Sequence, residues 1–311
     1  LRGNRGFFQM ARRAHLLAPS PPSPPSPRLH VLEPEAFVEE LTRLSYAVVA
    51  CPWEEARPAA MAMQRAEALL KAVQSPQSLS LSYKRQQDLK ERLQVRRTSD
   101  LKDPDGKDGE DGEELILSTF RVMEAVAKAA MEAWCDCQGF PSEVAKAHFG
   151  DLSFCEKPEG DAKAKGKSVL NLYHYFNEDA CLEEPCRQHA DPGMLTVLCR
   201  SSTTGLEVRL PRQPGGAPGV AATYQESWQD VEAIMDQCAA TLGEEGEGGP
   251  PPVCFLVIVG ETLERLSGGL HPSCLHRVVR TPAPRFNMAF ELRPRCNVWY
   301  PWQQILEGGT G

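Results

Sequence analysis

Three side chains that could bind a metal ion stand at two places in this sequence. His189 and Asp191 are two residues apart, and in a β-strand such residues project to the same face, which would put an imidazole beside a carboxylate. His276 could add a second imidazole from a distant strand. Two histidines and one carboxylate around a non-haem Fe(II) ion leave coordination positions open for a co-substrate and oxygen. The residue types therefore predict an iron site formed by His189, Asp191 and His276.

A second set of candidate site residues, which includes Arg285, follows His276 closely in the sequence. If residues 285–292 form a strand, alternation places one set of side chains together on the polar face: Arg285, Asn287, Ala289 and Glu291. An arginine on that face could hold a carboxylate through two parallel hydrogen bonds near the metal. Taken alone, an arginine is more often a surface residue, so the role of Arg285 depends on what surrounds it.

Composition limits the class of protein. The 311 residues carry a formal net charge of -8, which argues against a general nucleic-acid surface because phosphate contacts need clustered lysine and arginine. The 11 cysteines are scattered, and a chain of this length does not need disulfides, so we interpret them as reduced thiols. The longest strong apolar run, 253–259, is too short to span a membrane. We expect a small-molecule substrate, no nucleic acid, no membrane and a monomer.

Short strands dominate the second half of the chain. Runs with a period of two, separated by proline and glycine turns, predict strands at 168–176, 194–199, 206–210, 254–259, 276–280 and 286–292. Helical spacing of apolar residues predicts helices at 35–44, 58–73 and 115–134, with the apolar stretch 46–50 between the first two. This pattern favours a mainly β protein with flanking helices, built as a sandwich or jelly roll. Residues 211–252 are interpreted as a surface insertion that contains one helix near 228–238.

Two segments lack the apolar residues that a packed core requires. Residues 1–32 contain several arginines, a Ser-Pro repeat and no acidic residue, which is typical of either an organelle transit segment or a disordered extension. We therefore expect a cytoplasmic protein, with a plastid or mitochondrion as the alternative if this segment targets the chain. Residues 102–114 are rich in glycine and acidic residues and are predicted to form a mobile loop, because their spacing does not fit a calcium-binding loop.

Six segments of the chain, taken in order, resemble the isopenicillin N synthase-like family of Fe(II)/2-oxoglutarate-dependent dioxygenases. The likeness extends over about residues 168–294, and several motifs in sequence make it far more specific than a lone His-x-Asp. The segments are HADPGMLTVL at 189–198, GLEV at 205–208, WQDV at 228–231, VIVGE at 257–261, LHRVV at 275–279 and RFNMAFELRP at 285–294.

The resemblance implies a double-stranded β-helix, or jelly roll, in which His189, Asp191 and His276 hold the iron. The implied cofactors are Fe(II), 2-oxoglutarate as co-substrate and O2, with ascorbate as a reductant. The implied activity is the oxidation of a small organic substrate. Hydroxylation is the commonest outcome in the family, and desaturation or ring closure are the alternatives.

The resemblance also implies a binding group for 2-oxoglutarate. Arg285 and Asn287 match the family's Arg-x-Ser pair, which holds the distal carboxylate, but Asn287 replaces the serine and alters that part of the site. Tyr175 fits the position of a family tyrosine that reaches the same co-substrate, although Phe176 replaces the proline that normally follows it. An aromatic core residue is the alternative reading of Tyr175.

The predicted domain plan has four parts. Residues 1–32 are a disordered or targeting leader, 33–164 a helical N-terminal region packed on the core, 165–296 the jelly-roll core with its insertion at about 211–252, and 297–311 a C-terminal tail.

Two other functions remain open from the sequence. The altered Arg-x-Asn pair and the long acidic loops are compatible with a non-catalytic jelly roll that serves as an interaction module. A zinc hydrolase could use the same residues together with His271 or Cys274, since zinc favours nitrogen and sulfur ligands. The dioxygenase-like segments would have no explanation on that last reading.

Overall fold

The computed structural model describes residues 34–72, 81–86, 89–96, 112–139, 168–177, 184–212, 222–244 and 250–293. The predicted leader at 1–32, most of the predicted loop at 102–114 and the predicted tail at 297–311 lie outside these ranges. The last residues of that loop instead begin a helix. Among the described residues, no helix is long and apolar enough to cross a membrane.

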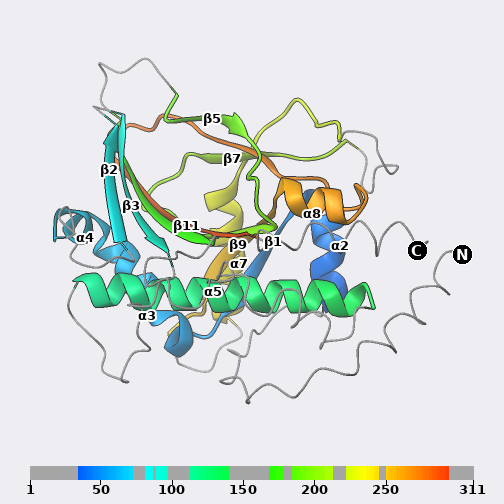
Figure 1. The fold of residues 1–311 in the computed structure, drawn as a ribbon, viewed down its shortest axis with the longest axis horizontal. Helices are drawn as coiled ribbons and strands as arrows, with labels where there is room; N and C mark the ends of the chain where they lie inside the picture. The colour runs from blue at the N-terminus through cyan, green and yellow to red at the C-terminus, as the bar shows by residue number, and fades with distance from the viewer. Residues whose placement is uncertain are drawn as a thin grey trace, which may run out of the picture.

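The helices of the N-terminal part lie along one side of the main sheet (Figure 1). They are α2 Pro34–Leu44, α3 Trp53–Gln64, α4 Ala66–Ala72 and α5 Gly112–Cys137. The stripe of apolar residues on α5 is buried, and the ring of Phe120 meets the ring of Phe290 edge-on at 5.3 Å between centroids. The single helix predicted at 58–73 is wrong, because the backbone leaves the helical conformation at Arg65 (φ -105°) and two helices form.

The main sheet of the described residues has seven antiparallel strands in the order β1-β9-β6-β11-β4-β3-β2. Four of them agree with predicted strands: β4 Val169–Tyr175, β6 Leu195–Cys199, β9 Val253–Val259 and β11 Arg285–Leu292. The other three are β1 Tyr46–Cys51, β2 Leu81–Gln86 and β3 Lys90–Arg96. The region 33–164 is therefore not only helical, since it supplies both edges of this sheet.

Tertiary pairing explains why those three strands were not predicted. β1 is a continuous apolar stretch, buried along most of its length, that pairs with β9 from Tyr46↔Ile258 to Cys51↔Val253. β3 carries charged or polar residues at five of its seven positions, so its alternation is weak in sequence, yet Leu93 and Val95 are fully or almost fully buried. Packing against the neighbouring strand therefore outweighs local preference here.

A smaller sheet of the described residues has the order β5-β10-β7-β8. Its strands are β5 Cys186–His189, β10 Leu275–Val278, β7 Leu206–Arg209 and β8 Gln229–Asp230. Two further helices follow strands: α7 Val231–Glu244 after β8, and α8 Glu261–Leu266 after β9. β8 and α7 belong to the predicted insertion at 211–252, so part of that insertion is built into the fold rather than lying apart from it.

The buried apolar residues form two clusters on opposite sides of the main sheet. One lies between this sheet and the helices and includes Phe37, Phe120 and Phe290. The other includes Tyr175 from the main sheet, Val208 and Val278 from the smaller sheet and residues of α7. The architecture is the predicted jelly roll with flanking helices, and the side of the main sheet that faces the smaller sheet carries the candidate site residues.

Candidate metal centre

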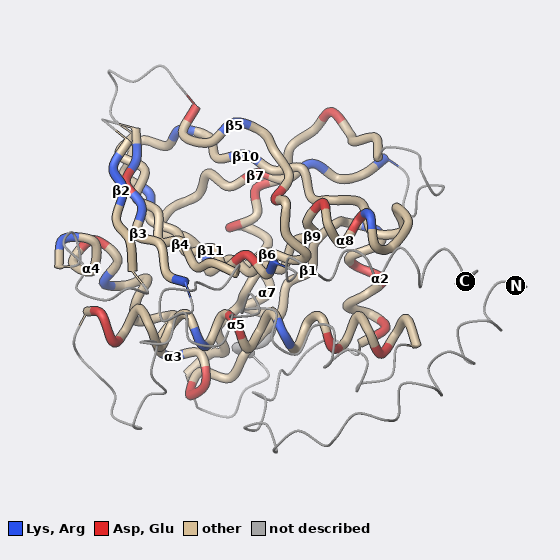
Figure 2. Tube along the Cα trace, in the orientation of Figure 1, with Lys and Arg blue, Asp and Glu red and all other residues tan. Residues whose placement is uncertain are grey.

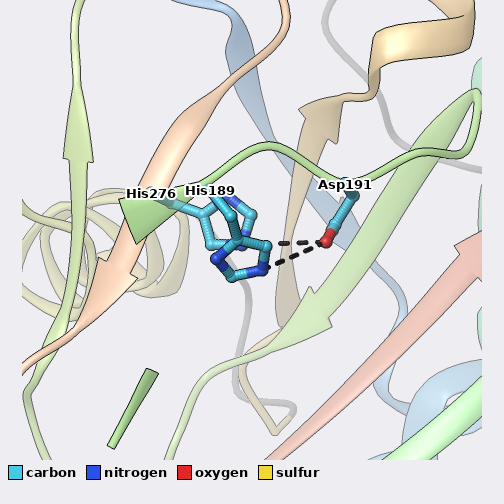
Figure 3. A group of neighbouring side chains, drawn as sticks. All are labelled: His189, Asp191 and His276. Carbon is cyan, nitrogen blue, oxygen red and sulfur yellow. Dashed lines mark ion pairs between the residues drawn. The ribbon is translucent and has the colours of Figure 1, made fainter. Parts of the chain in front are cut away.

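His189 and His276 lie opposite each other on the neighbouring strands β5 and β10. Their ring centroids are 4.3 Å apart. The Oδ1 atom of Asp191 lies 3.5 Å from Nε2 of His189 and 3.9 Å from Nε2 of His276. Figure 3 shows the three side chains pointing at one another. Their possible ligand atoms all lie within 4.8 Å of one another. We call these three residues the metal-ligand cluster, and among the described residues it is the one such group.

Asp191 does not lie on a strand, as the sequence argument assumed. β5 ends at His189, so Asp191 lies in the turn after the strand and not on the strand itself. That turn packs tightly against the start of α8, where the Asp191 carbonyl accepts a hydrogen bond of 2.8 Å from the Glu261 N–H. A Cβ atom at Gly260 would lie 2.3 Å from the carbonyl oxygen of Gly193, so a glycine is needed there. The close contact of two backbones fixes the carboxylate.

Backbone carbonyls orient both imidazole rings. Nδ1 of His189 lies 2.9 Å from the Arg187 carbonyl oxygen, and Nδ1 of His276 lies 3.0 Å from the Cys274 carbonyl oxygen. A carbonyl oxygen only accepts, so each Nδ1 carries a proton, and each Nε2 can present a lone pair to a metal ion that displaces any proton bound there. Both lone pairs belong to the atoms nearest Asp191, which is the arrangement that a metal ion requires.

Thr196 on β6 orients the third ligand, and the sequence argument did not single it out. Its hydroxyl donates a hydrogen bond of 2.5 Å to Oδ2 of Asp191. The other carboxylate oxygen, Oδ1, faces the two histidines. A threonine five residues after an aspartate carries no recognisable signal, since the turn between them decides whether they meet. The hydrogen bond leaves one oxygen of Asp191 directed at the proposed metal position.

The charges of the cluster suit a cation. Burial alone would raise the pKa of Asp191, but the hydrogen bond from His189, the positive charge available at His276 and the Thr196 hydroxyl lower it to about 2. The hydrogen bond to Asp191 raises the pKa of His189 to about 10, whereas burial lowers the pKa of His276. The carboxylate is therefore ionised at neutral pH and needs positive charge beside it. A divalent cation would replace the protons that otherwise supply this charge.

The candidate co-substrate residues meet where β11 pairs with β4. Arg285 lies opposite Tyr175, and Asn287 lies opposite Tyr173. Antiparallel partners share a face of the sheet, so these side chains stand together, and we call Arg285, Asn287 and Tyr175 the arginine group. Arg285 is 0% exposed and Asn287 is 4% exposed. The alternative that Arg285 is a surface residue is therefore wrong.

Arg285 retains hydrogen-bonding capacity despite its burial. Its Nη2 atom donates to the Ser201 hydroxyl and, over 2.8 Å, to Oε1 of Glu232. Its Nε and Nη1 atoms are buried and have no partner among the described residues. Unpaired buried donors are costly, so the guanidinium fits a further acceptor such as a carboxylate. Glu232 was not predicted, because it comes from the insertion.

The metal-ligand cluster and the arginine group lie on the same side of the main sheet. Burial raises the pKa of Tyr173 and of Tyr175, and the negative charge of Asp191 contributes to both shifts. The rings of the two tyrosines stack at 5.8 Å, and the Arg285 Cζ atom lies 5.8 Å from the centre of the Tyr175 ring. Tyr175 is thus both a core residue and a neighbour of the guanidinium.

The residues offered for a zinc hydrolase lie elsewhere. The ring of His271 is buried, with Nδ1 3.1 Å from the Thr42 hydroxyl and an edge-on contact to Trp134. Cys274 is fully buried, and its part in the site is the carbonyl that orients His276. Neither residue belongs to the metal-ligand cluster.

Comparison with known proteins gives an independent result. Residues 229–294 match the sequence model of the 2OG-Fe(II) oxygenase superfamily. The chain is 32% identical over 144 residues to gibberellin 20 oxidase 3 of Oryza sativa subsp. japonica, and the aligned part covers 43% of this chain and 30% of that relative. It is 30% identical over 151 residues to gibberellin 20 oxidase 2 of Arabidopsis thaliana, with 45% and 30% covered. The chain thus spans about a third of the length of the curated relatives it matches.

A solved structure shows the same fold over a larger part of the chain. The dioxygenase for auxin oxidation 1 of Arabidopsis thaliana, in its binary complex with 2-oxoglutarate, superposes with a TM-score of 0.57 at 13% identity. The superposition covers 85% of this chain and 88% of that one. The superposition shows the fold, and the sequence matches, the shared order of motifs and the metal-ligand cluster make the chain similar to the 2OG-Fe(II) oxygenase superfamily.

Proposed function

We propose that the protein is an Fe(II)- and 2-oxoglutarate-dependent dioxygenase that oxidises, most simply by hydroxylation, a small organic substrate. The observation that carries this proposal is the metal-ligand cluster: two imidazole Nε2 atoms and one carboxylate oxygen converge, and each ligand is oriented by a separate hydrogen bond. Such a set binds a metal on one side and leaves the other side open. A non-catalytic module would have no need to orient all three ligands.

One set of site residues would bind the metal and another would bind the co-substrate. Fe(II), 2-oxoglutarate and O2 would together supply the oxidation of a C–H bond, while 2-oxoglutarate is converted to succinate and CO2. His189, Asp191 and His276 would hold the metal. Arg285 would bind the distal carboxylate through its free donors, with Asn287 and the Tyr175 ring beside it. The surrounding apolar residues of both sheets would exclude water.

Basic side chains on β3 favour a substrate with an acidic group. Lysines and arginines gather on β2 and β3 at one end of the main sheet (Figure 2), although the whole chain has a net charge of -8. Lys90 lies opposite Tyr175 and Arg92 lies opposite Tyr173, so both half-buried cations stand on the side of the sheet that carries the site. Cations gathered beside a site raise the local concentration of anions.

The choice of substrate can be tested with a panel of small molecules. Turnover measured by succinate release should favour compounds with a carboxylate or another anionic group over their neutral analogues. For the best acid, Arg92→Gln should raise the KM at least tenfold, whereas Lys71→Gln, which alters an exposed lysine on α4, should not. Equal turnover of acids and their neutral analogues would refute the preference.

The proposed activity is tested first by binding. Protein loaded anaerobically with Fe(II) is titrated with 2-oxoglutarate, and the weak visible charge-transfer band of the chelate should appear and saturate. The same titration with Asp191→Ala should give no band. A parent protein that binds neither Fe(II) nor 2-oxoglutarate would instead support the non-catalytic interaction module.

We propose that the protein is a monomer and lies in the cytoplasm. Organelle targeting by residues 1–32 is the alternative. Light scattering of the purified chain tests the oligomeric state, and fractionation of cells that express the chain with and without residues 1–32 tests the compartment.

A further inference from the structure

Glu232 places a negative charge beside Arg285, the arginine that would bind the co-substrate. It stands in the first turn of α7, within the insertion, and its side chain is 1% exposed beside the 0% exposed Arg285. One carboxylate oxygen lies 2.8 Å from Nη2 of Arg285, and the other accepts the Leu206 N–H over 3.1 Å. The insertion thereby joins α7, β7 and β11 at a single buried ion pair.

The charge balance of this pair differs from that of an arginine alone. A buried arginine and the distal carboxylate of 2-oxoglutarate would form a neutral pair. With Glu232 already in place, the same carboxylate would leave one negative charge without compensation in a water-poor site, and such a charge is strongly unfavourable. Binding of a second carboxylate therefore requires Glu232 to withdraw from Arg285.

We propose that Glu232 is an internal competitor for the distal carboxylate of 2-oxoglutarate, so that the first turn of α7 sets the affinity for the co-substrate. This inference rests on the proposed function. Two features of the site carry it. Glu232 contacts only Nη2, and Nε and Nη1, which have no partner among the described residues, leave Arg285 donors for another acceptor. The Glu232 carboxylate also keeps a second partner, the Leu206 N–H, which can hold it when it leaves the guanidinium.

A merely structural role for Glu232 makes the opposite prediction. If Glu232 only holds Arg285 in place, its removal disorders the guanidinium and weakens the binding of 2-oxoglutarate. If Glu232 competes, its neutralisation strengthens binding. The sign of the change therefore separates the two roles.

The test uses the full chain loaded anaerobically with Fe(II) and measures the Kd of 2-oxoglutarate by calorimetry. Glu232→Gln keeps the size of the side chain but removes its charge, and should lower this Kd at least tenfold. Asp236→Asn is the matched control, because Asp236 lies one turn further along α7 and pairs with the exposed Arg200; it should leave the Kd unchanged. 2-Oxopentanoate, which lacks the distal carboxylate, should bind the parent and Glu232→Gln equally.

Glu232→Asp guards against a folding defect in the first variant. It keeps the negative charge, but its shorter side chain weakens the contact with Arg285, so its Kd should lie between those of the parent and Glu232→Gln. Binding of 2-oxoglutarate that is unchanged or weaker in both Glu232 variants would overturn the inference while leaving the proposed function intact. Absence of 2-oxoglutarate binding in the parent and in every variant would overturn both.

Discussion

The metal-ligand cluster and the arginine group lie on the same sheet face but are built in different ways. Each ligand of the cluster is oriented by a group close to it in sequence: a carbonyl two residues before each histidine, and a hydroxyl five residues after Asp191. Arg285 depends on distant residues, since Ser201 and Glu232 come from separate segments. The groups that hydrogen-bond the three ligands therefore lie outside the insertion at 211–252, whereas Arg285 pairs with Glu232 from within it.

The same contrast appears in the balance of charge. The cluster has one carboxylate for two imidazoles and suits an added cation. Arg285 of the arginine group is already paired with a carboxylate from outside the group, that of Glu232. The first site therefore gains from its proposed ligand, while the second must exchange one negative partner for another. Five predictions test this difference.

Asp191→Ala should have the largest effect. It removes the anionic ligand, and we expect the variant to bind no Fe(II) at concentrations that saturate the parent, because two imidazoles alone hold the ion weakly. Metal content after anaerobic loading measures this, and circular dichroism verifies the fold. Iron stoichiometry equal to that of the parent would remove the basis for the metal-ligand cluster.

Arg285→Leu should destabilise the fold itself. Removing one partner of a buried pair leaves Glu232 as an unpaired charge, which costs about 3 to 5 kcal/mol, and urea denaturation measures the loss. The double variant Arg285→Leu/Glu232→Leu should recover most of it. Both variants should also bind 2-oxoglutarate about 30-fold to 1000-fold more weakly than the parent, which corresponds to about 2 to 4 kcal/mol. Binding as tight as in the parent would show that the carboxylate lies elsewhere.

Thr196→Val should weaken the metal site without destroying it. The substitution keeps the shape of the side chain but removes the hydrogen bond that fixes Asp191, and such outer partners contribute about 10-fold to 100-fold to metal affinity. Thr241→Val, at an exposed position on α7, is the control. A competition assay with a chelator gives both affinities. An effect no larger than that of the control would show that the carboxylate needs no support.

His271 provides a buried histidine without an acidic neighbour for comparison with His276. Burial lowers the pKa of His271 from 6.5 to about 4, so the stability that depends on its neutral form is present above pH 6.5 and is lost as the pH falls towards 4. Between pH 7 and pH 5 this loss should be about 1 to 2 kcal/mol. His271→Gln should therefore show a smaller decrease in unfolding free energy over that range. Parallel profiles for the two proteins would exclude this role.

Asn287→Ser should have the smallest effect. Oδ1 of Asn287 is buried and has no partner in the part of the chain that the structure describes, so the shorter serine removes an unsatisfied acceptor and still offers a hydroxyl donor. We expect the Kd of 2-oxoglutarate to change by less than about threefold, or by less than about 0.7 kcal/mol. If the variant binds 2-oxoglutarate and the parent does not, Asn287 excludes this co-substrate and the natural protein uses another.

Sequence by itself identified the residues of the metal-ligand cluster and most of the strands around it, but not β5, which carries His189. Imidazole and carboxylate chemistry identifies His189, Asp191 and His276, and the period of two along 285–292 assigns Arg285 and Asn287 to one face. Both arguments depend only on residue type and on short-range geometry. For Asp191 only the residue type was right, because the strand position assumed for it was wrong and the segment after β5 brings its carboxylate to the histidines.

Only the tertiary structure decided what these residues touch. Side chains from segments far apart in sequence meet only when the sheets pair and the helices pack, and this brings Glu232 to Arg285 and His276 to His189. It also makes strands of β1, β2 and β3, whose local sequences are either uniformly apolar or mostly charged. A buried ion pair depends on which two side chains lose their water together, and no local pattern records that.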